Sequence, residues 1–531
     1  MTERQKEKPR IAVFSGPNAT VANSPPLVTS NKARLAGERR LEGRYDNLVP
    51  QLLYEPVTVK IKKFSAHPLE ADSKEVYHED GRDYYEVTLS PEDGPYLLPY
   101  MARRKVQGSK DGVPFEASDM WNPSLGFGGR QFFYPDASRI FDEIDRSTSG
   151  RGPDGEGSVL DKRADFDFVR VLPPGGFRSR GEIAGVHYFP YRPEPIAKII
   201  RAGDLATAAN IVQESLKKND YCGGIWLDGS PQLEESLYWL NLLIDTKLPI
   251  VGVAAQRPHG EVSSDGDRNI IDAVDYIISG KGEDLGAVGV ADQVIFASRE
   301  FKKADARPGN YKATGGHGGI LGSIKDGVSI WYRPAYKHTH KSEVNVSKLP
   351  SKHEFSDGTE TKILDGTGRL IPQSIPRVRI VKYASYSQED ESGDPRGESD
   401  IMGWVQKAMI DQRSSEQAGR PKLHGLVFEG LSPYAVGGPA QLLALWFAAA
   451  SGMPVVRVGR SDPGGKVITD PTDLTIEGSN LDSTKARLLL IAAMLKLGRL
   501  PSARDPSNPT IDERKAIVEK VAGFQAIFES H

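Results

Sequence analysis

From residue 195 onward, short apolar segments alternate with segments of helical periodicity, and this alternation constrains the fold more than any other feature. The predicted strands are residues 223–227 (GGIWL), 250–254 and 293–297, and the predicted helices are residues 232–244 and 269–278, preceded by two helices within 195–218. Strands that alternate with helices favour a parallel sheet with right-handed crossovers. The pattern therefore predicts an α/β unit.

A second α/β unit follows further along the chain. Its predicted strands are residues 378–383, 426–429 and 454–458, and its predicted helices are residues 439–450 and 483–497. Residues 335–375 are polar and without pattern, and we assign 346–375 as the linker between the units. Near the start, the apolar run at 11–15 precedes Gly16 and Pro17, which predicts a buried strand that ends in a loop.

Residues 35–175 differ from both units, because they are rich in charge, aromatic side chains, glycine and proline. Residues 57–61 and 84–89 alternate in polarity, which predicts strands, whereas residues 147–158 consist of turn-forming residues. We interpret 35–175 as a large insertion with some β structure. It could cover a site as a lid or extend an oligomer interface, and the sequence leaves both open.

The composition excludes several classes of protein. The 531 residues suffice for about two to three domains. The 68 basic and 71 acidic side chains give a net charge of −3, which excludes a strongly basic nucleic-acid binder. The single cysteine, Cys222, excludes an intramolecular disulfide and a cysteine-rich metal site. No apolar run reaches the ~20 residues of a membrane span, and residues 11–14 are too short for a signal-peptide core, so we expect a cytoplasmic protein with no membrane partner.

Polar residues follow the predicted strands, where α/β sheets bind their ligands. In WLDGSPQLEESLYWL (226–240), a strand ends at Asp228 and Gly229, and Ser230 precedes a helix. The free amides of a helix N-terminus attract carboxylates and oxyanions, so Ser230 lies where a substrate oxygen could bind. The alternative is that Ser230 only caps the helix.

Two further runs follow strands. Residues 254–272 hold Arg257, His259, Asp265 and Asp267 in a loop that suits a site, although Asp265 and Asn269 could simply cap and brace the next helix. In SREFKKADAR (298–307), a lysine with a lowered pKa could relay a proton, although most lysines are solvated.

Motifs for metal or phosphate chemistry are lacking. The glycine-rich run ATGGHGG (313–319) allows close approach to a backbone, and its His317 is either an acid–base group or a plain loop histidine. The chain has no HExxH, CxxC or GxxxxGK[ST] motif, and His338 and His340 are too isolated to indicate a metal site. We expect neither a metal nor another cofactor.

In their order and spacing, these runs resemble the asparaginase/glutaminase family of amidohydrolases. The family's TGGT-type loop corresponds to FSGPNATV (14–21), its THGTDTMEET-type segment to LDGSPQLEES (227–236), its AMRP-S-ADG-x-x-N pattern to residues 255–269, and its ARDVTKT-type run to SREFKKA (298–304). In the second unit, residues 427–432 resemble the AGxGNG loop, VVRVGRSDPGG the VVxSSRxPxG segment, and LDSTKARLLLIAAMLKLG the NPxKARLLLxLAL helix. The resemblance covers about residues 10–30 and 195–531 and leaves the insertion unexplained.

The resemblance implies an asparaginase-like α/β fold. A larger N-terminal domain with a parallel or mixed sheet would occupy residues 1–345, including the insertion, and a smaller C-terminal α/β domain would occupy residues 376–531. It further implies hydrolysis of a small-molecule carboxamide through a threonine nucleophile, without a cofactor. The family also forms homo-oligomers, so a dimer or tetramer is expected.

The family's functional residues carry over by position in the motifs. Its nucleophilic threonine corresponds to Thr20, its second threonine to Ser230 and its lysine to Lys303. We predict these three residues as catalytic, with Asp228 orienting or charging the Ser230–Lys303 pair. The predicted substrate-binding residues are Gly229, Gln232, Arg257 and Asp265.

Two departures from the family pattern bear on the substrate. The family's Thr-Asp pair is here Ser230-Pro231, and the aspartate helps to hold the α-ammonium group of asparagine, which a proline cannot do. The first loop, GPNAT, also lacks the family's glycine pair. We therefore expect an amide or cyclic amide other than free L-asparagine as the substrate.

Two function classes stay open. The alternative to an enzyme is a non-catalytic ligand-binding or regulatory protein on the same scaffold, which the proline at position 231 would also suit. An amino-acid racemase-like enzyme is disfavoured, because that chemistry generally needs two opposed cysteines and the chain has one.

Overall fold

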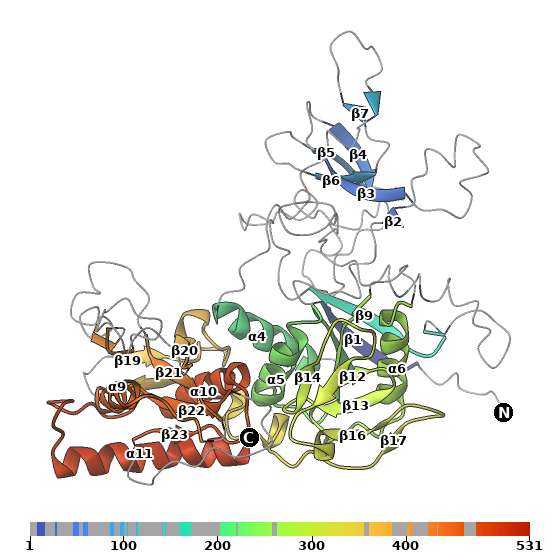
Figure 1. Ribbon diagram of the computed structural model, residues 1–531. Coiled ribbons are helices and arrows are strands. Elements are labelled where there is room, and N and C mark those ends of the chain that lie inside the picture. Colours follow the sequence, from blue (N-terminus) through green and yellow to red (C-terminus); the bar gives the residue numbers. More distant parts are fainter. Residues whose placement is uncertain are drawn as a thin grey trace, which may run out of the picture.

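A computed structural model shows two α/β units side by side, with α5 of the first unit packed against α10 of the second (Figure 1). The structure describes residues 8–15, 159–160, 162–170, 202–218, 221–257, 263–354, 360–384, 401–403, 405–406, 423–432, 434–460 and 474–531, with residues 141 and 144 and short strands between 27 and 114.

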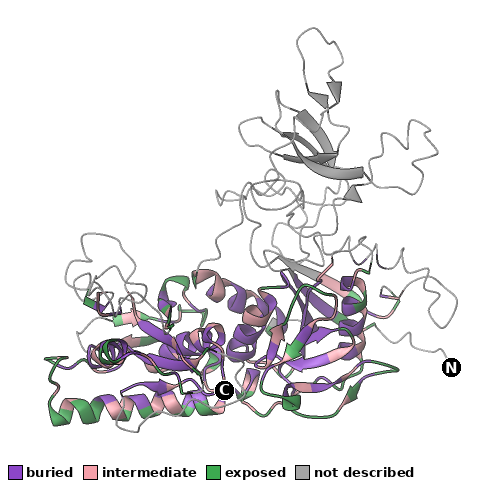
Figure 2. Ribbon diagram, viewed as in Figure 1, coloured by how far each residue is buried: buried purple, intermediate pink, exposed green. Residues whose placement is uncertain are grey.

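The first unit is built on an eight-stranded sheet in the order β17-β16-β13-β12-β11-β10-β1-β9. Its parallel strands are β9 (Asp165–Arg170), β1 (Arg10–Ser15), β10 (Tyr221–Leu227), β11 (Ile250–Val253) and β12 (Ala287–Ala291). Phe14 packs in a core with α4 (Ala202–Lys218) and α5 (Leu233–Leu243), whereas Val13 faces a second core with α6 (Gly266–Ile278). Helices thus cover both faces, and the central strands are buried (Figure 2).

The far end of this sheet is antiparallel, which the strand–helix alternation did not predict. β12 continues into β13 (Val294–Ala297), and β16 (Ile320–Ser323) and β17 (Ser329–Ile330) extend the antiparallel part. Asp292 and Gln293 join β12 to β13 with φ of 49° and 63°. Two left-handed residues fit the right-handed twist of a hairpin. Asp-Gln is an unusual pair for such a turn, so the hairpin and β12 itself carried little sequence signal.

Two boundaries near the insertion differ from expectation. β9 lies inside 35–175, yet it is the edge strand of the main sheet and pairs with β1 in parallel register from Arg10–Asp165 to Ser15–Arg170. Of the two helices expected within 195–218, the structure describes α4; residues 195–201 lie outside the described part.

Other described residues of the insertion form short strand pairs. β4 (Val57–Ile61) and β5 (Tyr85–Leu89) pair antiparallel, which confirms the two strands predicted there. Within the insertion, β3 (Asp46–Gln51) pairs with β6 (Tyr96–Pro99) and β7 (Arg103–Arg104) with β8 (Val113–Pro114), and β2 (Leu27–Val28), which precedes the insertion, pairs with β3.

The second unit is a parallel four-stranded sheet of β20 (Val378–Lys382), β21 (Gly425–Gly430), β22 (Val455–Gly459) and β23 (Ile476–Glu477). Helices α9 (Pro439–Ala450) and α10 (Ser483–Leu497) have the predicted bounds. Helix α11 (Ile511–Ser530) was not predicted, although Thr510 and Glu513 form a capping box at its start. The predicted α/β fold class, with a larger mixed-sheet unit and a smaller parallel one, is confirmed.

The segment expected to be a patternless linker has regular structure. It contains the short helices η6 (Thr339–Lys341), η7 (Val346–Lys348) and η8 (Pro372–Ser374) and the hairpin of β18 (Lys352–Glu354) and β19 (Glu360–Lys362). Asn345 is fully buried, and its side-chain amide donates hydrogen bonds to Thr339 O and Ser342 O, both at 3.0 Å. Hydrogen bonds from side chains to the backbone hold this segment in place. Such bonds follow no periodic pattern in the sequence, so the segment was predicted to be a patternless linker. The domain boundaries stay a prediction.

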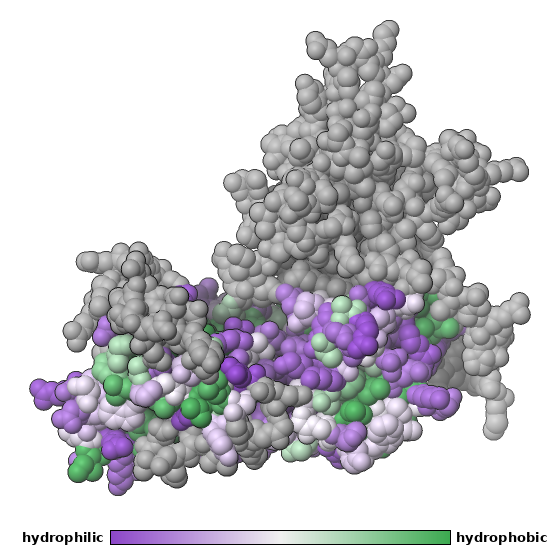
Figure 3. Space-filling view, viewed as in Figure 1, coloured by the Kyte–Doolittle hydropathy of each residue, from purple (hydrophilic) through white to green (hydrophobic). Residues whose placement is uncertain are grey.

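The described surface mixes hydrophilic side chains with scattered apolar patches (Figure 3). The large apolar side chains that are exposed are Trp331, Tyr332, Tyr434, Val436, Leu443 and Ile511. Among the described residues, no helix combines the length and apolar character that crossing a membrane requires.

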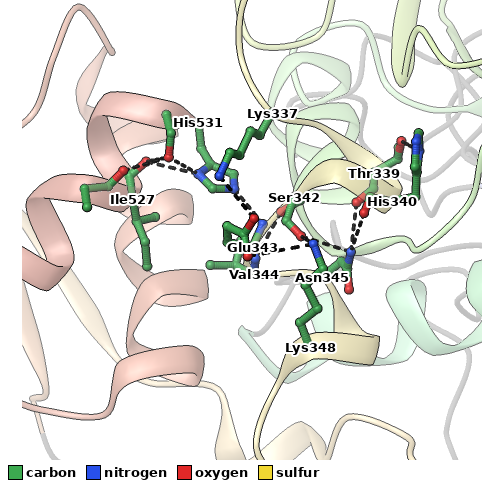
Figure 4. A network of polar contacts seen from close by, with 12 residues as sticks. Lys337, Thr339, His340, Ser342, Glu343, Val344, Asn345, Lys348, Ile527 and His531 are labelled. Carbon is green, nitrogen blue, oxygen red and sulfur yellow. Dashed lines mark hydrogen bonds and ion pairs between the residues drawn. The ribbon is translucent and has the colours of Figure 1, made fainter.

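His531, which follows α11, joins this helix to the segment after β17 (Figure 4). Its buried ring bonds through Nδ1 to Ile527 O at 3.1 Å, and its Nε2 accepts a hydrogen bond from the Glu343 backbone N–H at 2.8 Å. Nε2 must therefore be unprotonated. Burial lowers the pKa of His531 to about 4, the charges of Lys337 and Lys348 lower it as well, and Glu343 raises it.

We expect His531 to make the stability of the protein pH-dependent. The unfolded chain takes up this proton near pH 6.5 but the folded one only near pH 4, so stability is retained above pH 6.5 and lost as the pH falls toward 4. The difference amounts to at most about 3 kcal/mol. Urea denaturation of the wild type, of His531→Gln and of the exposed-loop control His317→Gln between pH 7 and 4 measures it. If the free energy of unfolding changes equally with pH in the wild type and in His531→Gln, His531 is not the source of the pH dependence.

Candidate active site

Three parallel strands end together at one edge of the first sheet. In the register, Ser15 at the end of β1 lies opposite Leu227 at the end of β10, and Leu227 lies opposite Val253 at the end of β11. The Asp228 N–H donates to Val253 O at 3.2 Å, which extends this contact into the loops. The polar segments that follow β10 and β11 therefore begin side by side.

Ser230 and Lys303 meet at this edge. Ser230 lies in the turn between β10 and α5 and is buried, and Lys303 is the last residue of β14 (Phe301–Lys303). Lys303 Nζ donates a hydrogen bond to Ser230 Oγ at 2.7 Å. Two residues that the sequence placed on separate runs are thus brought into direct contact.

The surroundings of Lys303 favour a neutral amine more than water does. Burial lowers the pKa of Lys303, while the charges of Glu234, Asp265 and Asp305 raise it, and the net shift is downward. Glu234, in the first turn of α5, also accepts a hydrogen bond from the Lys303 backbone N–H at 2.7 Å. This glutamate thus ties the end of β14 to the helix that starts after Ser230.

Asp228 is buried, and its described bonds hold the turn before Ser230. Its Oδ1 accepts from the Gly229 N–H at 2.8 Å, and its Oδ2 accepts from Trp226 Nε1 at 3.0 Å and from Ser236 Oγ at 2.5 Å. Burial raises the pKa of Asp228, against the effect of these bonds. Because Asp228 Oδ1 holds the Gly229 N–H, that amide is a poor candidate for binding an oxyanion.

Asp265 braces the loop after β11. Its Oδ1 accepts from the backbone N–H groups of Gln256 at 3.0 Å and Arg257 at 2.9 Å. Asn269 bonds to Ala254 O at 3.0 Å and accepts from the Asp292 N–H at 3.0 Å. These contacts match the alternative in which both residues brace a loop, although the Asp265 side chain does not cap α6.

The other predicted site residues contribute less to the described geometry. Gln232 is the N-cap residue of α5, and its backbone N–H donates to Gly229 O at 2.9 Å. Thr20 and His259 lie outside the described residues. His317 is exposed, and His338 bonds to Tyr336 O at 2.9 Å. Among the residues that the structure describes, no group of three or more His, Cys, Asp and Glu is arranged to hold a metal ion.

The second unit supports the strand that carries Lys303. Lys485, in the first turn of α10, is fully buried, and its Nζ donates to the carbonyl oxygens of Ser298 at 2.9 Å, Arg299 at 2.8 Å and Phe301 at 2.6 Å. Lys302 pairs with Asp482, which caps α10, at 3.2 Å. Both residues lie in the LDSTKARLLLIAAMLKLG run, but sequence reasoning predicted no role for either, because each acts on a partner about 180 residues away.

Residues 198–334, which contain Ser230 and Lys303, match the family model for the asparaginase N-terminal domain. This part of the chain is similar to the asparaginase family. The family model thus supports the resemblance of the sequence motifs, and the Ser230–Lys303 contact joins the LDGSPQLEES and SREFKKA runs within the matched region.

Individual relatives match parts of the chain. It is 31% identical over 147 residues to the glutaminase-asparaginase of Acinetobacter glutaminasificans, covering 28% of this chain and 44% of that protein. It is 27% identical over 297 residues to L-asparaginase 2 of Bacillus subtilis, covering 55% of this chain and 66% of that protein. The chain thus spans less than half the length of the glutaminase-asparaginases it matches.

Among solved structures, a probable cytoplasmic L-asparaginase from Campylobacter jejuni aligns with a TM-score of 0.47 at 19% identity. The alignment covers 70% of this chain and 92% of that one.

Proposed function

We propose that the protein is an amidohydrolase that cleaves the C–N bond of a carboxamide or cyclic amide other than free L-asparagine. The observation that carries this proposal is the 2.7 Å bond between Lys303 Nζ and Ser230 Oγ at the carboxyl edge of a parallel sheet. A buried hydroxyl on a lysine with a lowered pKa can pass a proton between a nucleophile and a leaving group.

In the proposed mechanism, Thr20 is the nucleophile. Its Oγ attacks the amide carbon, and its proton passes through the Ser230 hydroxyl to the Lys303 amine. The C–N bond then breaks, the proton moves to the nitrogen, and ammonia or an amine leaves. Water hydrolyses the Thr20 ester, which restores the threonine and releases the acid. The Ser230 N–H is the candidate oxyanion donor, since Gly229 donates to Asp228.

The remaining predicted residues have supporting roles in this proposal. Asp228 orients the turn that carries Ser230, as its bonds to Gly229, Trp226 and Ser236 suggest. Gly229, Gln232, Arg257 and Asp265 are proposed to bind the substrate. A cytoplasmic homo-oligomer, dimer or tetramer, is proposed from the family resemblance alone.

The substrate proposal rests on Pro231, which is exposed and offers no carboxylate to an α-ammonium group. An ammonium left unpaired in a closed site costs several kcal/mol. We therefore expect succinamic acid, which has the amide and carboxylate of asparagine but no ammonium, to be hydrolysed with a kcat/KM at least about tenfold above that of L-asparagine. In Pro231→Asp, the ratio of kcat/KM for succinamic acid to kcat/KM for L-asparagine should decrease.

Ammonia release from a panel of carboxamides and cyclic imides measures this expectation, with Thr20→Ala as the variant that lacks the proposed nucleophile. A higher kcat/KM for L-asparagine would overturn the substrate assignment. If no amide is hydrolysed while panel compounds raise the melting temperature, the protein is a ligand-binding member of the family and not an enzyme.

A further inference from the structure

The geometry points to Tyr311 as a further substrate-contacting residue, whose hydroxyl donates a hydrogen bond to an oxygen of the substrate held at Ser230. This inference rests on the proposed function. It concerns a residue that no motif singled out, on the strand next to Lys303.

Strand pairing places Tyr311 beside Lys303. Tyr311 is the first residue of β15 (Tyr311–Ala313), which pairs antiparallel with β14, and Tyr311 lies directly opposite Lys303 in the register. Directly opposed residues of an antiparallel pair project from the same face. Tyr311 and Lys303 therefore both reach toward the turn that holds Ser230.

Packing fixes the ring of Tyr311. It stacks on Phe301, with the ring centroids 4.7 Å apart and the planes 15° from parallel. Phe301 in turn lies over Gly289 of β12, where a β-carbon would come within 2.7 Å of the Phe301 ring. A ring held in this way cannot swing to find another partner, so the position of its hydroxyl is set by the core.

The Tyr311 hydroxyl is buried without a hydrogen bond of standard geometry to any described residue. Buried polar groups almost always have a partner, and an exception calls for a missing water or ligand. Ser230 lies close enough to interact with this hydroxyl, since its side chain lowers the pKa of Tyr311. The unused donor thus lies beside the Ser230–Lys303 bond.

The charges around Tyr311 decide which kind of ligand atom it can bind. Burial raises the pKa of Tyr311, and the carboxylates of Asp265 and Glu234 raise it further. The phenol therefore keeps its proton and acts as a donor. Its ligand must be an acceptor, which an amide substrate supplies as its carbonyl oxygen or as a carboxylate oxygen.

The test compares Tyr311→Phe with Tyr276→Phe. Tyr276 is a matched control, because its hydroxyl is also buried without a partner among the described residues, but it lies on α6 in the second core. With succinamic acid as the probe, Tyr311→Phe should lower kcat/KM at least about tenfold, since removing one well-placed donor typically has an effect of this size or larger. Tyr276→Phe should stay within about twofold.

Thermal melting separates this role from a structural one. Removing an unpartnered hydroxyl should leave the melting temperature of Tyr311→Phe unchanged or raise it, as in Tyr276→Phe. A fall in kcat identifies the carbonyl oxygen as the acceptor, and a rise in KM identifies the carboxylate. If Tyr311→Phe keeps full activity, the inference is wrong and the amidohydrolase proposal stands. The same holds if its activity and its melting temperature decrease together. If the wild type hydrolyses no amide of the panel, both the inference and the amidohydrolase proposal are wrong.

Discussion

Replacement of Lys303 by methionine is expected to reduce ammonia release from the best substrate by at least about a hundredfold, because general acid–base groups typically contribute 10²–10⁴-fold. Methionine keeps the length of the side chain but removes the amine that holds Ser230 Oγ at 2.7 Å. The initial rate of ammonia release under subsaturating substrate measures the effect.

The pH profile gives the Lys303 prediction a second readout. Burial lowers the pKa of Lys303 below its ordinary value of 10.5. If the neutral amine takes the proton, wild-type kcat/KM should rise with pH along a limb that begins below that value, and Lys303→Met should lack the limb. Lys312→Met is the matched control, since Lys312 is exposed on the same hairpin, and it should keep both rate and profile. A Lys303→Met variant with wild-type kinetics would remove lysine from the mechanism.

Replacement of Lys485 by methionine is expected to produce the largest loss of stability, about 3–5 kcal/mol in the free energy of unfolding. The ammonium of Lys485 uses all three donors on carbonyl oxygens of residues 298, 299 and 301, and methionine would leave these acceptors buried and unpaired. Chemical denaturation monitored by tryptophan fluorescence measures the change.

The control for this loss is Lys515→Met, on the exposed side of α11, which should change stability by no more than about 0.5 kcal/mol.

Burial lowers the pKa of Lys485, but the neighbouring charge of Asp482 raises it. Although burial raises the pKa of Asp482, the charges of Lys485 and Lys302 bring it to about 2. A loss below about 1 kcal/mol for Lys485→Met would mean that the three carbonyls find water instead.

Local sequence was sufficient where an element is a run of mostly apolar residues. Helices α9 and α10 have the predicted bounds, Pro439–Ala450 and Ser483–Leu497, and the parallel strands β10 and β11 match within about two residues. The pattern failed at the antiparallel end of the first sheet. There Val294–Ala297 matches the strand predicted at 293–297, but Ala287–Ala291 was not predicted, because the two residues that join these strands include no glycine to mark a hairpin.

The candidate site was only partly accessible from the sequence. Ser230 and Lys303 were identified through the family motifs, and the structure places their side chains in contact across 73 residues. Tyr311 carried no signal, and Lys485 lay in the KARLLL motif without a predicted role, because a tyrosine in a short strand and a lysine in a helix are ordinary until their neighbours are known. Thr20 stays a prediction.

The sequence by itself determined the α/β class, the order of the two units and the resemblance to the asparaginase family, because apolar periodicity and motif order are properties of neighbouring residues. The tertiary structure alone decided that Lys303 touches Ser230, that Tyr311 lies opposite Lys303 with its hydroxyl buried, and that Lys485 of the second unit holds the strand of the first. Such contacts join side chains far apart in the chain, and they form only when the packing of the whole fold fixes where each strand ends.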